Sequence, residues 1–376
     1  MAAKTTVCSA PGKVLLAGGY LILSRPHAGT VLALDARFYS AVTVRQPAEQ
    51  LQPGEIAISV ASPQFGELRH YIYASGPAGE EASLRPVGDG AHRPNRYVEI
   101  PLLYALTVAR ALTATSRART APLALDITLA ADNGFYSQVA AVQARGLPLT
   151  AASLASLPPM LEPLAGDDGE VAKTGLGSSA TLVTSLVAAL LHALGAIKLP
   201  SPDSSGSALS PSARAQLETL HALAQLCHCA AQGKVGSGFD VCVATFGSQR
   251  YTRFSPSVLE PVLRLPDAAT PPPALLLATI GAAAAGVAAG GGAEPLRFDH
   301  EVTPFQLPPG VQVMMADVCC GAHTPSMVKQ VLAWRASHPE APALWAGYAS
   351  SSARLQVRMR QTMESLFYWI LEHYTR

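Results

Sequence analysis

Charged residues are scarce in this chain, and neither sign dominates. Lys, Arg, Asp and Glu make up 14% of its 376 residues, and the formal net charge at pH 7 is +1. Proteins that bind nucleic acid need a concentrated basic surface, and no block of Lys and Arg stands out here. Apolar residues make up 49%, which argues against intrinsic disorder. We therefore expect one large or two moderate folded domains, with neither nucleic acid nor membrane as a partner.

Cysteines are also few, and their spacing gives no disulfide framework. The chain has six, several of them close together, such as Cys227 and Cys229 or Cys319 and Cys320. The first residues lack the order of a secretory signal, and the last, LEHYTR, match no peroxisomal or ER-retention address. A reduced, cytoplasmic compartment is predicted. No metal site is expected at Cys227-His228-Cys229, because neighbours on a helix point in different directions and no second ligand pair lies at zinc spacing.

One stretch lacks charge altogether. Residues 274–293 are uncharged over about the length that spans a bilayer. They are mostly Ala and Gly, which supply little transfer free energy. We expect a strand followed by a flexible Gly/Ala insert, not a membrane helix.

Periodicity divides the rest of the chain into elements. Branched and aromatic runs predict strands, and apolar residues at helical spacing predict helices. Strands are expected at 14–23, 30–44, 55–61, 68–74 and 122–138, helices at 95–115, 179–196, 213–232 and 324–336, and loops at 75–95, 140–170 and 201–213. An amphipathic helix is expected at 356–374. Proline-rich linkers begin after residue 257, so we place a domain boundary near residue 265.

Two common phosphate-binding signatures are missing. The pattern GxxxxGK[ST] does not occur, and neither do the HRD and DFG motifs of protein kinases. Gly175 to Ala180 fits the relaxed dinucleotide fingerprint GxGxxA. However, GDDGEVAK precedes it in place of a hydrophobic strand, and the acid at the required distance, Asp203, lies in a polar loop. We therefore do not favour a dinucleotide site.

The stretch KTGLGSSA nevertheless has the chemistry of an anion site. Glycines let the backbone approach a ligand closely, and the free N–H groups at the start of a helix point toward it. The helix adds about half a positive charge at that end. The candidate residues are Lys173, Thr174, Gly175, Leu176, Gly177, Ser178, Ser179 and Ala180. On this loop alone, a serine-capped helix with a glycine turn is an equally good interpretation.

Two more glycine-containing turns add charge. APGKVLLAGGYLIL places Lys13 near the start of the first predicted strand, and GKVGSGFDV places Asp240 after a Gly/Ser loop. Phosphoryl transfer needs a cation, a cradle for phosphate or metal, and an orienting carboxylate. The three turns together supply these parts.

The order of the three stretches resembles that of the GHMP kinase superfamily, named for galactokinase, homoserine kinase, mevalonate kinase and phosphomevalonate kinase. PGKVLLAGGY, KTGLGSSA and KVGSGFD are most similar to the eukaryotic phosphomevalonate kinases. DNGFYSQ, YTRFSP, HEVTPFQLPPG and TPSMVKQVLAW resemble that family as well, so the match covers nearly the whole chain.

The resemblance implies an α+β fold with two domains. Residues 1–265 would form an ATP-binding domain like ribosomal protein S5 domain 2, and residues 266–376 a ferredoxin-like C-terminal domain. The implied reaction transfers the γ-phosphoryl group of ATP to (R)-5-phosphomevalonate, with Mg²⁺, in the isoprenoid and sterol pathway. Residues 173–180 would wrap the ATP phosphates, with Ser178 as the magnesium ligand and Ser179 as a phosphate contact. Lys13 would stabilise charge on the transferring group, beside Asp240.

The acceptor changes what Asp240 is expected to do. A phosphate monoester, whose second pKa is about 6, is mostly ionised at pH 7, so no base has to remove a proton. We expect Asp240 to orient Lys13 or magnesium instead. The expected substrate contacts are Tyr20, Ser137, Lys234 and Ser237; Arg37 and Arg250 are further candidates for the acceptor phosphate, and Asn133 and Tyr136 for the lining of the site.

The C-terminal part departs from the family pattern. These kinases carry a glycine-rich turn of the form GAGGYDA, and nothing after Trp345 resembles it. Gly321-Ala322-His323 stands where relatives commonly read Gly-Ser. We expect an incomplete C-terminal domain, and two alternatives stay open. One is another GHMP kinase with a hydroxyl acceptor such as mevalonate or a sugar. The other is a catalytically impaired nucleotide-binding homologue.

Overall fold

The computed structural model describes residues 4–48, 50–76, 81–88, 93–113, 122–164, 171–200, 209–266, 270–281, 298–307, 310–316 and 324–374. The predictions made for residues 201–208, 282–293, Cys319-Cys320 and Gly321-Ala322-His323 lie outside these ranges.

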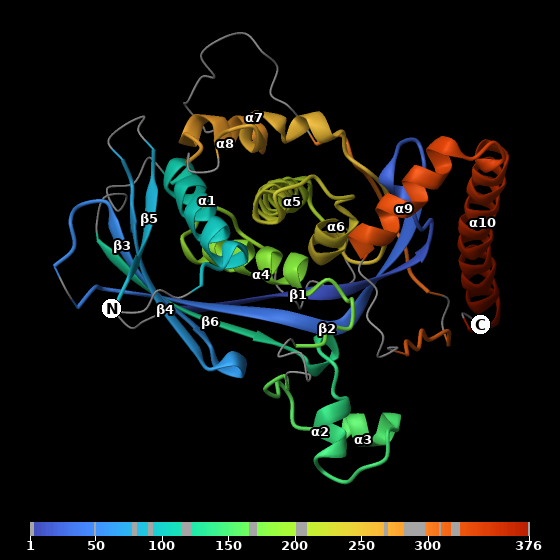
Figure 1. Ribbon diagram of the computed structural model, residues 1–376, viewed down its shortest axis with the longest axis horizontal. Coiled ribbons are helices and arrows are strands. Elements are labelled where there is room, and N and C mark those ends of the chain that lie inside the picture. The colour runs from blue at the N-terminus through green and yellow to red at the C-terminus, as the bar shows by residue number, and fades with distance from the viewer. Residues whose placement is uncertain are drawn as a thin grey trace.

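An eight-stranded mixed sheet forms the base of the molecule (Figure 1). Its strands are β1 (Lys4–Ala17), β2 (Ala28–Arg45), β3 (Glu55–Ser62), β4 (Glu67–Ala74), β5 (Ser83–Val87), β6 (Leu123–Ala131), β7 (Gln249–Thr252) and β8 (Glu301–Pro304). The order is β5-β4-β3-β6-β2-β7-β8, and β1 pairs with β2. The β3–β6 pair is parallel and the other pairs are antiparallel. The predicted α+β class is confirmed.

Helices cover one face of this sheet. They are α1 (Arg96–Leu112), α4 (Ser178–Ala193), α5 (Pro211–Gln232) and α6 (Phe239–Phe246), with α7 (Glu260–Leu263) and α8 (Pro273–Thr279) on their outer side (Figure 1). Helix α4 lies against β1 and β2, and its apolar face is fully buried at Val183, Leu186, Val187 and Leu190. Helix α5 packs on α1, α4 and α6. The four-residue apolar steps along α4 therefore mark the face that packs on the sheet.

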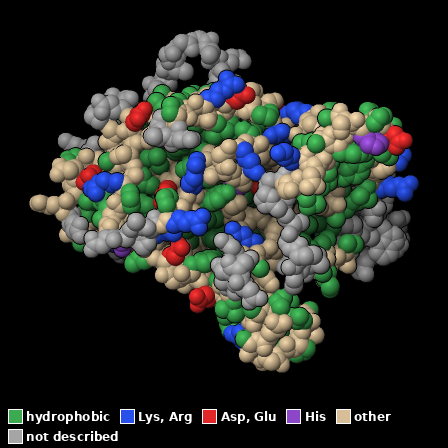
Figure 2. All heavy atoms as spheres, viewed as in Figure 1, with side chains coloured by type: hydrophobic (Ala, Val, Ile, Leu, Met, Phe, Trp, Pro, Cys, Tyr) green, Lys and Arg blue, Asp and Glu red, His purple; other side chains and the backbone are tan. Residues whose placement is uncertain are grey.

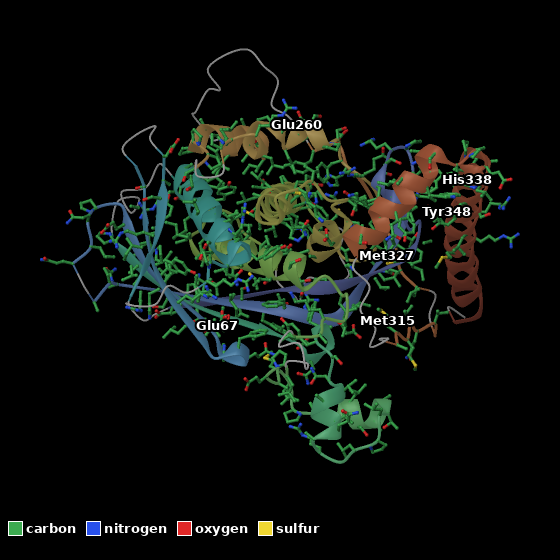
Figure 3. The ribbon with its side chains drawn as sticks, in the orientation of Figure 1. Glu67, Glu260, Met315, Met327, His338 and Tyr348 are labelled. Carbon is green, nitrogen blue, oxygen red and sulfur yellow. The ribbon has the colours of Figure 1, made fainter. Side chains whose placement is uncertain are left out.

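The remaining elements lie around this body. Short helices α2 (Val139–Gln143) and α3 (Ala151–Ala155) project beyond the sheet, and α9 (Thr324–Ser337) and α10 (Ala341–Tyr374) stand at one end (Figure 1). Single 3₁₀ turns are η1 (Leu21–Leu23), η2 (Pro63–Phe65), η4 (Asn133–Phe135) and η6 (Pro256–Val258). Tyr348, Met327 and His338 belong to the α9–α10 end, away from Glu67 on the opposite side (Figure 3). No helix among the described residues is long and apolar enough to cross a membrane.

Several predicted boundaries were wrong. The strand expected at 14–23 ends at Ala17, after which η1 begins, and the strand expected at 122–138 ends at Ala131. The loop expected at 75–95 contains β5, an edge strand whose residues are mostly exposed, so its polar composition concealed it. The loop expected at 140–170 contains most of α2 and all of α3.

The apolar start of the 274–293 stretch is helical, so the predicted strand was wrong there. Helix α8 has a proline at its first position, where the missing N–H costs nothing. Leu276 and Leu277 are buried in the main core. A short apolar run fits a buried strand or a buried helix equally well, and packing against α1 and α7 decided this one.

Candidate active site

Lys13 lies where β1 departs from regular pairing. The register with β2 shifts between Pro11 and Lys13, a local irregularity that re-aims the side chain. The Lys13 ammonium donates a hydrogen bond to the Gly175 carbonyl at 2.7 Å, and the Lys13 backbone N–H donates to the Leu176 carbonyl at 3.0 Å. Two residues that are 162 positions apart in the sequence are thus joined directly. The structure brings the predicted lysine to the predicted anion loop.

The loop that precedes α4 is fastened to η4. The backbone N–H of Ser137 donates to Ala172, and that of Thr174 donates to Phe135. The Thr174 hydroxyl donates to the Gly134 carbonyl at 2.6 Å. The motif DNGFYSQ, which contains η4, therefore holds the loop through these hydrogen bonds.

Gly177 sets the entry into α4. It has φ +82°, a left-handed conformation that only glycine adopts at little cost. An added Cβ would stand 3.1 Å from Cε of Lys13, so side-chain space is also restricted. The helix starts directly after it at Ser178, and no side chain among the described residues caps its first N–H groups. These free donors, together with the positive end of the helix dipole, point to an anion at this end.

The two serines of the loop differ in their partners. Ser179 Oγ lies 3.1 Å from Nε2 of His228, a hydrogen-bonding distance. Within the described part of the chain, no group bonds the Ser178 hydroxyl, which is half-buried at the first position of α4. Ser178 is therefore free to contact a ligand, whereas Ser179 is held by α5.

The third turn brings Asp240 into the first turn of α6. Gly238 precedes it with φ +83°, and an added Cβ there would lie 2.6 Å from Phe254 and 2.9 Å from the Tyr251 hydroxyl. The Arg253 guanidinium fixes this turn by donating to the Gly236 carbonyl at 2.7 Å. Helix α6 packs on both α4 and β1. The aspartate is therefore placed by tight packing around glycine.

The electrostatics show that Lys13 and Asp240 act on each other. Burial lowers the pKa of the Lys13 ammonium below its ordinary value, and the negative charge of Asp240 opposes that shift. The Lys13 ammonium also lies 5.6 Å from the centre of the Phe239 ring. A lysine with a partly compensated charge beside a helix N-terminus is suited to receive an anion.

His228 is a residue of this site that sequence reasoning missed. Its Nε2, which contacts Ser179, also lies 3.0 Å from Nε2 of Gln232, one turn further along α5. Burial lowers the pKa of His228; Asp240 raises it and Lys234 lowers it further. Its neighbours in the sequence, Cys227 and Cys229, directed attention to metals. The signal that could have identified His228 is its position one turn before the end of α5, close to the GKVGSGFD turn that carries Asp240.

The predicted substrate contacts are placed unevenly. Lys234 and Ser237 lie in the turn between α5 and α6, with Lys234 exposed. Tyr20, at φ 57°, lies at the start of η1 and close to Tyr348 of α10, whose pKa is raised by burial and further by Tyr20. Ser137 is held through its backbone to the loop at Ala172. Lys234 and Ser237 are thus brought near Asp240, whereas Ser137 lies beneath the loop and Tyr20 faces α10.

The other candidates are engaged elsewhere. Arg37 donates to the Ser9 hydroxyl at 2.8 Å and to the Ser9 carbonyl, and Arg250 donates to Gln356 of α10 at 3.0 Å. Lys173 is exposed on the loop, with its backbone bridged to Tyr136. Figure 2 shows Lys and Arg side chains spread over one face among acidic ones.

Asn133 and Tyr136 serve the packing below the loop. The Asn133 side chain donates to the Pro158 carbonyl at 2.7 Å and accepts from the Leu161 N–H at 2.8 Å. Tyr136 is buried, which raises the pKa of its phenol to about 12. We therefore assign both residues to support of the loop.

Comparison with known proteins gives a consistent picture. No protein-family model matches the chain. It is 37% identical to the peroxisomal phosphomevalonate kinase of Arabidopsis thaliana over 371 residues, which cover 94% of this chain and 68% of that protein. It is 38% identical to a phosphomevalonate kinase of Aspergillus fumigatus over 389 residues, which cover 96% and 72%.

Among solved structures, the Streptococcus pneumoniae phosphomevalonate kinase in complex with phosphomevalonate and AMPPNP is similar to this chain with a TM-score of 0.42. The identity is 14%, and the match covers 87% of this chain and 67% of that one. A likeness at that score supports no conclusion about this chain.

Proposed function

The chain belongs to the phosphomevalonate kinase family, and from this premise we propose that it transfers the γ-phosphoryl group of ATP to (R)-5-phosphomevalonate. The product is the corresponding diphosphate, an intermediate of isoprenoid and sterol synthesis. The observation that carries the proposal is the hydrogen bond between the Lys13 ammonium and the Gly175 carbonyl. It places a cation at the N-terminus of α4, where free backbone donors also gather.

Lys13 can hold the transferring group without losing its anchor. An ammonium has three N–H donors, and the Gly175 carbonyl takes one. The other two donors are available for phosphate oxygens. Because this hydrogen-bond acceptor is a neutral carbonyl, it does not neutralise the ammonium, and the positive charge that Asp240 leaves uncompensated can stabilise negative charge that develops during transfer.

The loop and the start of α4 fit the phosphate chain of a nucleotide. The first N–H groups of α4 have no capping side chain, and the Ser178 hydroxyl is unpaired within the described part. A hard cation such as Mg²⁺ prefers oxygen ligands, and Ser178 is the residue that we assign to it. When bound, the ion would neutralise phosphate charge.

Asp240 acts here as an orienting group. The acceptor phosphate has a second pKa of about 6, so it is already ionised at pH 7 and needs no base. Burial lowers the pKa of Lys13, and the negative charge of Asp240 opposes that shift and so favours the charged ammonium. The exposed ammonium of Lys234, next to the same turn, is our candidate for the acceptor phosphate, and Ser237 for a hydroxyl contact.

An ADP-release assay with three acceptors tests this function. We expect turnover with (R)-5-phosphomevalonate and none with mevalonate or galactose. Turnover on mevalonate alone would overturn the choice of acceptor, and no turnover on any acceptor would overturn the proposed transfer itself.

Ser178→Ala tests the assignment of the metal. It should raise the Mg²⁺ concentration that gives half-maximal rate about tenfold, by loss of one ligand. Ser212→Ala, which removes an exposed hydroxyl at the start of α5, is the matched control and should leave that concentration unchanged.

The compartment is a separate proposal. We assign the chain to the cytoplasm. The free thiols of Cys8, Cys227, Cys229 and Cys242 fit a reducing compartment. The name of the Arabidopsis thaliana relative places that protein in the peroxisome. Fluorescence microscopy of the tagged chain, with a peroxisomal marker beside it, distinguishes the two compartments.

A further inference from the structure

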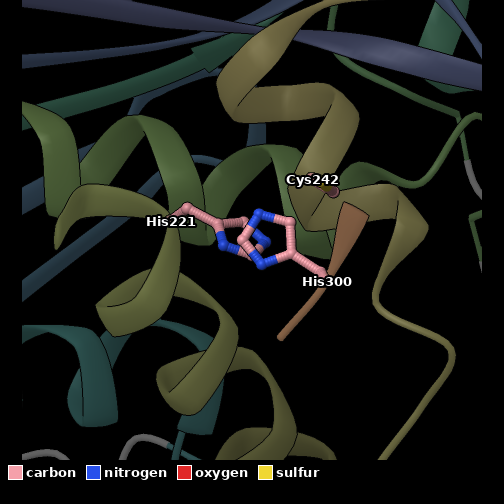
Figure 4. A group of neighbouring side chains, drawn as sticks. All are labelled: His221, Cys242 and His300. Carbon is pink, nitrogen blue, oxygen red and sulfur yellow. The ribbon is translucent and has the colours of Figure 1, made fainter. Parts of the chain in front are cut away.

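A second polar cluster lies behind the site, in the core between α5, α6 and the start of β8. It consists of His221 on α5, Cys242 on α6 and His300 just before β8 (Figure 4). The rings of His221 and His300 lie against each other, with their centres 4.4 Å apart. His221 and Cys242 are fully buried, and the His300 side chain is 4% exposed. The phosphoryl-transfer chemistry uses none of these residues.

Hydrogen bonding in this cluster is incomplete. Neither ring nitrogen of His221 has a partner, and Nδ1 of His300 has none among the described residues. The buried Gln249 amide has no nitrogen or oxygen partner among the described residues, and it lies within hydrogen-bonding reach of the Cys242 thiol. Buried polar atoms almost always find partners, and each one that does not is costly to fold. A ligand in the cluster would satisfy these atoms together.

His300 is already oriented as a metal ligand would be. Its Nε2 lies 3.3 Å from a carboxylate oxygen of Glu218, so this nitrogen is the protonated donor. The lone pair is then on Nδ1, the nitrogen without a partner. A carboxylate that holds the far nitrogen of a histidine is the usual support of a histidine bound to zinc.

The geometry is close to that of a tetrahedral site. One ligand atom from each of the three residues lies within 4.8 Å of the other two. Bonds of about 2.0–2.3 Å to a tetrahedral zinc place ligand atoms about 3.3–3.6 Å apart. The separations therefore have to shorten by about 1.5 Å at most, which side-chain rotations would provide.

The local charge also favours a divalent cation. Once the metal has displaced the thiol proton, the Cys242 sulfur and the Glu218 carboxylate contribute two negative charges, and Arg214, whose Nε donates to Glu218 at 2.7 Å, contributes one positive charge. A divalent ion brings this group to a net charge of +1. With thiolate and imidazole ligands, zinc fits better than magnesium or calcium, which prefer oxygen.

We propose that His221, Cys242 and His300 bind one zinc ion that fastens α5, α6 and the start of β8 to one another. The imidazoles bind in their neutral form, and the Cys242 thiol gives up one proton as the sulfur–zinc bond forms. A water molecule completes the tetrahedron, and the unpaired Gln249 amide is its hydrogen-bonding partner. The role is structural, and it is independent of the proposed phosphoryl transfer.

Zinc and cobalt binding to the full chain tests the site. After removal of metal with a chelator, the wild-type protein should take up about one zinc per chain, measured by elemental mass spectrometry, and release one proton. Its melting temperature should rise on zinc addition. Cobalt should give the near-ultraviolet band of a thiolate-to-cobalt bond and the visible bands of tetrahedral coordination.

Two variants of the site, Cys242→Ser and Glu218→Gln, and one control, Cys227→Ser, separate this site from others. Cys242→Ser should lose zinc affinity at least 100-fold, whereas Cys227→Ser, which changes another fully buried helical thiol, should retain it. Glu218→Gln should weaken binding about 10–100-fold, as loss of a supporting carboxylate does.

Absence of zinc and cobalt uptake by the wild-type chain overturns the proposal even if both variants fail to fold. Cobalt bound without a thiolate band, or equal zinc uptake by Cys242→Ser and wild type, overturns it as well.

Discussion

Helices α5 and α6 carry two polar clusters that differ in how their groups are satisfied. Toward the C-terminal end of α5, His228 contacts Ser179 and Gln232 and senses Asp240. Two turns earlier on the same helix, His221 has no hydrogen-bond partner among the described residues. On α6 the two clusters also differ in burial, because Asp240 is half-buried and Cys242 is fully buried.

Helices α5 and α6 therefore each contribute residues to two sites that suit different kinds of chemistry. The cluster near Lys13 is a partly open, charged site whose free donors await an exchangeable anion. The cluster around His221 is buried from solvent, and the ring nitrogens of His221 have no hydrogen-bond partner among the described residues, which suits a permanently bound ion. Each prediction below tests the assignment of groups to the first cluster.

The largest effect is expected from Lys13→Met. The substitution keeps most of the side-chain volume but removes the charge beside α4, so kcat should fall by two or more orders of magnitude. Lys198→Met, at the other end of α4 and exposed, should retain wild-type turnover within about twofold. The ADP-release assay measures both. Near-normal turnover of Lys13→Met contradicts the role given to this residue.

Asp240→Asn should be the next most damaging change. It removes the charge that supports Lys13, and we expect roughly a 100-fold loss in kcat. Because no proton is abstracted, the acidic limb of the pH profile of kcat should be retained. Loss of the Asp240 charge lowers the pKa of Lys13 further, so the alkaline limb should move to lower pH. Asp126→Asn, which breaks an exposed ion pair with Arg45, serves as the control. A loss of the acidic limb in Asp240→Asn would show that this carboxylate acts as a base.

Gly177→Ala should separate backbone strain from function. Alanine at φ +82° costs about 1–2 kcal/mol of folding free energy, and its Cβ would press on Lys13. Gly195→Ala, after the other end of α4, has φ +74° and open space around its Cβ. Denaturant unfolding should show similar losses for the two variants, whereas calorimetry should show weaker ATP binding only for Gly177→Ala. Equal ATP affinity in both would remove the loop from the site.

The smallest effect concerns pH and His228. Burial lowers the pKa of His228 in the folded state. Below about pH 6.5 this histidine is therefore protonated in the unfolded chain while it stays neutral in the folded one. The free energy of unfolding should therefore decrease as pH falls from 6.5, by at most about 1.4 kcal/mol per pH unit from this group. His228→Gln should flatten the slope between pH 6.5 and 5, measured by urea unfolding. The difference at pH 8 gives the baseline cost of the substitution, and an unchanged slope contradicts the assignment.

Much of the local structure was predictable because its cause lies in neighbouring residues. The helix expected at 95–115 is α1, Arg96–Leu112, and its start is fixed by Asn95, whose side chain accepts from the Tyr97 N–H. The helix expected at 213–232 is α5, whose side-chain cap is Ser210. Strand β5 and helix α8 were missed because an exposed edge strand and a short buried helix owe their form to what they pack against.

Within the site, the residue types were predictable but their neighbours were not. The sequence marked Lys13, the 173–180 loop and Asp240 as charge, cradle and carboxylate. Nothing in the sequence favoured His228 over its cysteine neighbours as a residue of the site. Nor did the sequence exclude Arg37 and Arg250 as contacts of the acceptor phosphate, because their partners Ser9 and Gln356 are distant in the chain. The division into domains near residue 265 stays a prediction.

The sequence by itself determined the parts: three glycine turns, the helix that follows the loop, and the family to which their order belongs. These follow from short-range rules of backbone conformation and from motifs read along the chain. Only the tertiary structure decided that Lys13 bonds Gly175, that His228 holds Ser179, and that His221, Cys242 and His300 meet in the core. Such contacts join residues far apart in sequence. The packing of α5 on α1, α4 and α6, and of α6 on β1 and β2, brings them together, and no local pattern encodes it.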